Sequence, residues 1–158
     1  MNTEQLREHL QYKIPQIRLA LLREPIQEPL PNICTPRDLE PYLEPLRHMS
    51  EENFVCLHLN VLLQVTGFHL VSQGTVSTSL AHPREVFKAA ILNNAYSVVV
   101  AHNHPSGSLI PSEDDVTTTK HLIAAGELLG IKLLDHLIVS FTGLASVRED
   151  YPSLFGDK

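Results

Sequence analysis

The sequence has little of what marks secreted or membrane-spanning proteins. It contains only two cysteines, Cys34 and Cys56, without the CxxC spacing of a redox or zinc motif. Cys56 lies in the apolar run 54–59, so we expect a buried thiol rather than a disulfide or a metal ligand. No run reaches the roughly eighteen consecutive apolar residues of a transmembrane helix. The first residues also lack the basic and then apolar pattern of a signal peptide. We therefore expect a cytoplasmic protein without membrane contact.

Runs of basic residues are also lacking, and the formal net charge is −6. Nonspecific affinity for nucleic acid comes mainly from Lys and Arg side chains that neutralise phosphates. Direct nucleic-acid binding is therefore not favoured, although a local basic patch is compatible with this net charge.

The hydrophobic residues, 43% of 158, are enough for a core that needs neither a metal nor a disulfide to hold it together. Seven of the eleven prolines fall in the first fifty residues. This uneven distribution predicts an irregular, partly helical N-terminal arm over residues 1–50 and a regular domain over residues 51–158. Within the arm, 3–11 and 16–22 have helical periodicity, and Thr35-Pro36 is typical of a helix start.

Strand-like and helix-like segments alternate in the domain, which predicts an α/β fold with a mixed sheet. Thr66-Gly67 is the expected turn between the first two strands, and Gly130 is the expected end of the second helix. The expected strands are 54–63, 68–72, 96–101 and 131–141, and the expected helices are 83–93 and 115–129.

A cluster of metal-binding residue types lies between the third strand and the second helix. His102 and His104, two residues apart at the strand end, would project to the same side and reach one ion. Asp115 falls in the first turn of the helix that Ser112 opens. Two histidines and one carboxylate leave a fourth tetrahedral position for water, which is typical of catalytic zinc. Ser112 and Asp115 could also form only a helix cap, and the two roles are compatible.

These residues form the pattern His-x-His, seven residues, Ser, two residues, Asp, which resembles the JAMM motif of the JAB/MPN metalloproteases. Flanking blocks make the likeness more specific, over about residues 50 to 150, and resemble the RadC-like branch; they include 82–87, 129–131, 134–136 and 146–149. The resemblance implies a JAB/MPN-like sheet sandwiched by helices and bound Zn²⁺. It also implies that Ser112 hydrogen-bonds the metal water or the oxyanion of the intermediate.

A zinc hydrolase also needs a general base. By resemblance this base is Glu52, just before the strand beside the metal strand, with Glu51 and Glu85 as alternatives. Asn103 should point away from the two histidines and tie down the loop, while His136 is either a partner of a ligand or a packed core residue.

The sequence thus predicts a zinc-dependent metallopeptidase or isopeptidase-type hydrolase acting on a peptide or protein. The alternative is a RadC-like accessory protein of DNA repair or DNA metabolism with weak or no hydrolysis; its expected helix-hairpin-helix pattern is absent from the arm. The segment Asn60–Gln64 is more apolar than a turn should be. It is a candidate surface for a second copy, so a homo-oligomer stays open.

Overall fold

The computed structural model describes Gln5 and residues 31–74 and 81–156. The helical periodicity predicted over 3–11 and 16–22 falls outside these residues, apart from Gln5. Three short helical turns come first, η1 (Pro36–Leu39), α2 (Glu40–Leu43) and η2 (Glu44–His48). The domain continues with β1 (Asn53–Leu59), β2 (Val65–Gln73), α3 (Pro83–Leu92), β3 (Ser97–Asn103), α4 (Glu113–Leu129), β4 (Lys132–Ser140), β5 (Gly143–Ser146), α5 (Val147–Asp150) and η3 (Pro152–Phe155).

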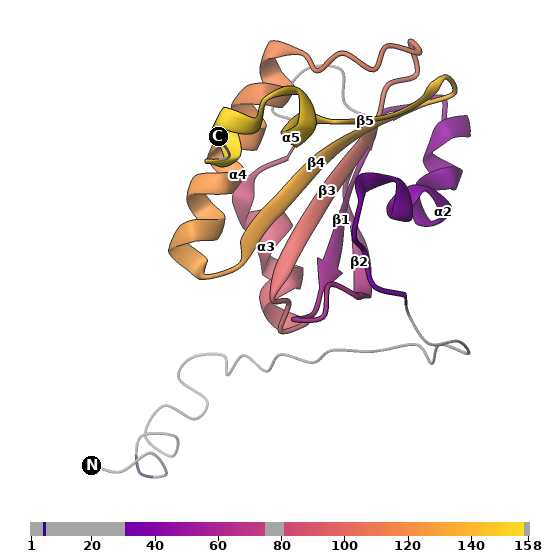
Figure 1. Ribbon diagram of the computed structural model, residues 1–158. Helices are drawn as coiled ribbons and strands as arrows, with labels where there is room; N and C mark the ends of the chain where they lie inside the picture. Colours follow the sequence, from indigo (N-terminus) through magenta and orange to yellow (C-terminus); the bar gives the residue numbers. More distant parts are fainter. Residues whose placement is uncertain (1–4, 6–30, 75–80, 157–158) are drawn as a thin grey trace.

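The five strands form one mixed sheet in the order β2-β1-β3-β4-β5. Only the β3–β4 pair is parallel, and α4 is the crossover between these two strands. Helices α3 and α4 lie on one face, and the turns η1 to η2 lie on the other (Figure 1). This arrangement confirms the predicted α/β fold, with a mixed sheet between helices.

Two apolar cores, one on each face, hold the layers together. On β1, Val55 and Leu57 face the helical turns, whereas Phe54 and Cys56 face α3 and α4. Every residue of β1 and of β3 is buried, because both strands are covered on both faces. The turns from Pro36 to His48 contribute to the first core through Leu39, Leu43 and Leu46.

The prediction for the first hairpin was wrong in its details. The first strand ends at Leu59 rather than at residue 63, and the turn covers 60–64 instead of Thr66-Gly67. The Asn60 side chain explains the shift, since its Oδ1 accepts hydrogen bonds from the backbone N–H groups of Leu62 (2.9 Å) and Gln64 (3.0 Å). The apolar tip of this turn is exposed, so its contact with a second copy stays a prediction.

The later strands and helices that the sequence predicted lie close to their predicted positions, whereas β5, α5 and η3 were not predicted. Thr35 precedes Pro36 at the start of η1, as expected. Gly130 ends α4 with a φ of 68°, a left-handed conformation that glycine adopts without strain. Within the described part of the chain, no helix has both the length and the apolar character needed to cross a membrane.

Candidate metal centre

The candidate site lies where β3 ends and α4 begins. His102 is the penultimate residue of β3, and the His104 backbone N–H extends the ladder by donating to the Val139 carbonyl on β4 (2.8 Å). Asp115 lies in the first turn of α4, as predicted. The loop between His104 and Asp115 contacts Phe141. A Cβ added to Gly107 in this loop would lie 2.5 Å from the Phe141 ring. Gly107 also has a φ of 87°, a left-handed conformation that glycine adopts without strain.

The three predicted ligands converge in the structure. The Nε2 atoms of His102 and His104 are 2.9 Å apart. Asp115 places Oδ1 3.1 Å from His102 Nε2 and Oδ2 3.4 Å from His104 Nε2. Atoms that share a tetrahedral zinc ion at roughly 2.0–2.1 Å lie about 3.3 Å apart. One ligand atom from each of the three side chains lies within 4.8 Å of the other two, so together they could hold one ion.

Two further observations support this fit. Asp115 is completely buried, and its Oδ1 has no hydrogen-bond partner, although an unsatisfied buried carboxylate oxygen is costly. His104 Nδ1 lies 3.0 Å from the Ser108 carbonyl, which can only accept, so this nitrogen carries the proton. In the neutral ring the Nε2 lone pair therefore points toward the other ligands. A cation among these atoms would satisfy both groups.

Ser112 holds the carboxylate of Asp115 through a reciprocal helix cap. Its backbone N–H and its hydroxyl both donate to Asp115 Oδ2, at 2.6 and 2.7 Å, and its Oγ accepts from the Asp115 N–H at 3.1 Å. Oδ2 is thus occupied, whereas Oδ1 is left for a metal. The hydroxyl would have to leave Asp115 before it could contact an oxyanion.

The Asp115 carboxylate and the His104 imidazole each shift the pKa of the other. Burial disfavours the Asp115 carboxylate, yet the adjacent His102 and His104 imidazoles outweigh it, and the hydrogen bond from Ser112 adds to their effect, so the Asp115 pKa is held well below its usual range. The adjacent Asp115 carboxylate raises the pKa of His104, and the negative charge of Glu52 adds to this effect. The site therefore presents an ionised carboxylate to any bound cation.

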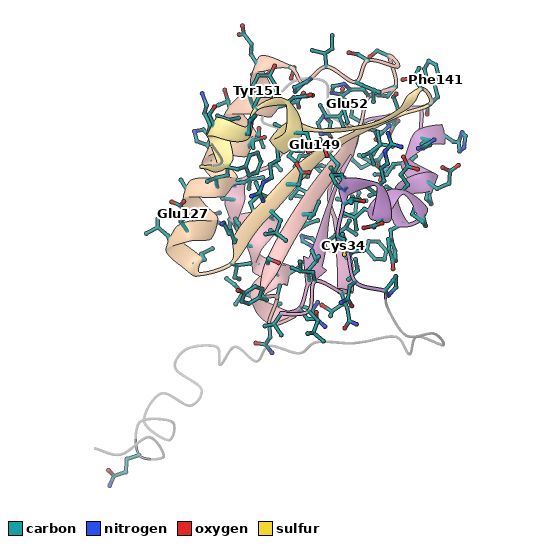
Figure 2. All side chains as sticks on the ribbon, viewed as in Figure 1. Cys34, Glu52, Glu127, Phe141, Glu149 and Tyr151 are labelled. Carbon is teal, nitrogen blue, oxygen red and sulfur yellow. The ribbon has the colours of Figure 1, made fainter. Side chains whose placement is uncertain are left out.

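Glu52 lies at the same end of the sheet as Phe141 and the loop after β3 (Figure 2). Asn103 fixes this segment, because its side chain bonds the peptide groups on both sides of Glu52. Asn103 Oδ1 accepts from the Asn53 N–H at 2.7 Å, and its Nδ2 donates to the Glu51 carbonyl at 2.9 Å. As predicted, Asn103 points away from the histidines. The segment that it holds is the one before β1, however, and not the loop after β3. Glu85, the weaker candidate, is exposed on α3 and pairs with Lys88 at 2.9 Å.

Sequence reasoning left the role of His136 open and missed Thr119. His136 is fully buried on β4, and its Nε2 lies 2.8 Å from His102 Nδ1. Thr119 Oγ1, on α4, lies 2.7 Å from His136 Nδ1. Burial lowers the pKa of His136 well below its ordinary value and keeps the ring neutral. His136 is thus a hydrogen-bonded partner of a ligand. Two sequence signals point to this pair: Thr119 follows Asp115 by one helical turn, and His136 interrupts an apolar strand.

A family model described as "RadC-like JAB domain" matches residues 33–151. The chain belongs to the RadC-like JAB domain family. The matched range includes the three candidate ligands, Glu52, Ser112 and the helical turns before β1.

Curated relatives of this chain are named as UPF0758 proteins. A UPF0758 protein of Moorella thermoacetica is 46% identical over 104 residues, which are 66% of this chain and 45% of the relative. A UPF0758 protein of Symbiobacterium thermophilum is 48% identical over 104 residues, which are 66% of this chain and 44% of the relative. A UPF0758 protein of Finegoldia magna is 49% identical over 98 residues, which are 62% of this chain and 44% of the relative. The chain thus spans less than half the length of these relatives.

Proposed function

We propose that this RadC-like domain is a zinc-dependent metallopeptidase or isopeptidase-type hydrolase. The observation that carries the proposal is the convergence of His102 Nε2, His104 Nε2 and the unpartnered Oδ1 of buried Asp115. Two imidazoles and one carboxylate suit zinc and leave a position for water, as in catalytic rather than structural sites. The proposed substrate is a peptide or protein, with an amide bond as the scissile group.

When bound, zinc would lower the pKa of a coordinated water to about 7 and polarise the scissile carbonyl. The remaining work falls to side chains of this chain. Glu52 accepts the proton of the attacking water and delivers it to the leaving amine. Asn103 keeps Glu52 at the site by holding the peptide groups that flank it. Ser112 orients Asp115, and its hydroxyl supports the oxyanion once it turns away from Oδ2.

A metal-dependent nuclease is less well supported. Phosphodiester hydrolysis frequently uses two metal ions roughly 3.5–4 Å apart. The other metal-ligand cluster among the described residues, Cys56 with His58 and His69, lies toward the β2 edge of the sheet and contains none of the three proposed ligands. Its imidazoles are also hydrogen-bonded without an ion, since His58 Nε2 and His69 Nδ1 lie 3.1 Å apart.

The metal content of the purified protein, measured by elemental analysis, tests the proposal. We expect one zinc per chain in the wild type and in Cys56→Ala, and none in His102→Ala or His104→Ala. All four should stay folded, because the core is large enough to stand without the ion. Retention of zinc in both histidine variants would reject the site, whereas loss in Cys56→Ala would move the metal to the other cluster.

Turnover tests the hydrolase itself, with a library of labelled peptides and isopeptide-linked conjugates as substrates. Glu52→Gln keeps the size of the side chain but removes the proton acceptor. We expect zinc to stay bound while turnover falls by roughly 10²- to 10⁴-fold. Glu51→Gln and Glu85→Gln are matched controls that should retain activity. A zinc-loaded wild type that cleaves nothing in the library would leave the hydrolase without support.

A further inference from the structure

A chain of three buried hydrogen bonds runs from the backbone of α4 to the ligand His102. Thr119 Oγ1 lies 2.7 Å from the Asp115 carbonyl and 2.7 Å from His136 Nδ1. His136 Nε2 in turn lies 2.8 Å from His102 Nδ1. Thr119, His136 and His102 are completely buried, so water does not compete for these contacts.

The chemistry of the groups fixes the direction of every bond in this chain. The Asp115 carbonyl can only accept, so it takes the single hydroxyl proton of Thr119. Thr119 must then accept from His136, which places the His136 ring proton on Nδ1. The His136 ring is completely buried, and its two nitrogens contact a hydroxyl and an imidazole rather than a carboxylate, so the ring is neutral and its Nε2 accepts from His102 Nδ1–H. The remaining nitrogen of a neutral His102 ring, Nε2, therefore carries a lone pair toward His104 and Asp115.

We propose that Thr119 and His136 are positioning residues that set the tautomer of His102 and so prepare its Nε2 for the metal. The inference rests on the proposed zinc site and adds two residues to it. A neutral imidazole carries its proton on one nitrogen or the other, and only the Nδ1–H form leaves Nε2 free to bind. Neighbouring groups that donate or accept at the second ring nitrogen commonly fix this choice in metal sites.

The two histidine ligands are fixed by different means. His104 is half-buried, and the backbone carbonyl of Ser108 fixes its tautomer, which no side-chain change removes. His102 depends on side chains, so its tautomer can be changed by mutation. Its ring also stacks on Phe54, with ring planes 9° apart, which holds the ring plane but does not distinguish the two nitrogens. The hydroxyl of Thr119 is therefore the group that gives the chain its direction.

The closing experiment uses Thr119→Val, which keeps the shape of the side chain and removes the hydroxyl. Without an acceptor, His136 can turn its proton toward His102, which then carries a proton on the nitrogen that should bind metal. We expect the zinc dissociation constant, measured by chelator competition, to rise by roughly 10- to 100-fold. Thr119→Ser should restore most of the affinity. Thr118→Val, which removes the neighbouring hydroxyl, should bind zinc as the wild type does.

A second measurement uses only the wild-type protein without metal, so it does not depend on the folding of a variant. Nitrogen-15 NMR of the histidine rings reports which nitrogen carries the proton, and we expect His102 and His136 in metal-free wild type to be protonated at Nδ1. His102 protonated mainly at Nε2, or wild-type zinc affinity in a folded Thr119→Val, would overturn the inference. A purely structural role for Thr119 would lower stability but leave the tautomers and the zinc affinity of the folded protein unchanged. Absence of zinc from the wild type would reject the metal site, while the NMR result would still decide the tautomers.

Discussion

We predict that His58 on β1, which pairs with His69 on β2, makes the domain less stable in mild acid. Asn93 Nδ2, at the end of α3, lies 3.0 Å from His58 Nδ1, and His58 Nε2 lies 3.1 Å from His69 Nδ1. His69 Nε2 lies 3.1 Å from the Glu85 carbonyl. The amide donates and the carbonyl accepts, so the series is satisfied by two neutral rings. Protonation of His58 would place an N–H against the amide donor.

The size of this loss in the free energy of unfolding follows from the pKa of His58. Burial, and then the neighbouring His69, lowers this pKa from 6.5 to about 4. At pH values between these two, the unfolded chain binds a proton that the folded protein does not. His58 therefore does not weaken folding above about pH 6.5. Its destabilising effect grows as the pH falls toward 4, and linkage gives a loss of roughly 2 kcal/mol between pH 7.5 and pH 5.

Urea unfolding at pH 7.5 and pH 5 measures this loss against a variant, His58→Asn, which keeps an acceptor for Asn93 and cannot titrate. Other groups change charge over the same range, so the informative quantity is the pH-dependent loss of the wild type minus that of the variant. We expect the wild type to lose roughly 2 kcal/mol more than the variant. Equal losses in the two proteins would refute the assignment of a neutral, buried His58.

The remaining predictions use other parts of the molecule. In Gly126→Ala the new Cβ would lie 2.5 Å from the Ile131 carbonyl oxygen, so chemical denaturation should show a loss of roughly 1–3 kcal/mol with zinc content unchanged. Ser112→Ala removes the cap of α4 and the hydroxyl on Asp115 Oδ2; we expect about 1 kcal/mol lower stability and weaker zinc binding, and an unchanged zinc affinity would argue against its role on Asp115. DNA binding should be weak, with a shallow dependence on salt, because the net charge is −6; submicromolar affinity for duplex or single-stranded DNA at physiological salt would favour the DNA-metabolism alternative instead.

The strand, loop and helix that carry the ligands could be predicted from the sequence because their signals are local. Ser112 and Asp115 share one helical turn, and Gly130 ends that helix through its own backbone freedom. The first turn could not be placed, because the Asn60 side chain replaces the glycine that the pattern led us to expect. Sequence signals mark Thr119 and His136 individually, but their contact was not predicted. It depends on how α4 crosses over the β3–β4 pair.

Three consecutive residues connect the two halves of the proposed chemistry. His102, on the α4 face of the sheet, is a proposed metal ligand, while Asn103, on the opposite face, holds the backbone around Glu52. His104 follows beyond the strand and returns to within 2.9 Å of His102. The alternation of side chains along β3 thus places His102 and the segment that carries Glu52 on neighbouring parts of the sheet, because β3 pairs with β1 and Phe54 is the partner of His102. This placement follows from the pairing of β1 with β3 and from the packing of α4 over the sheet.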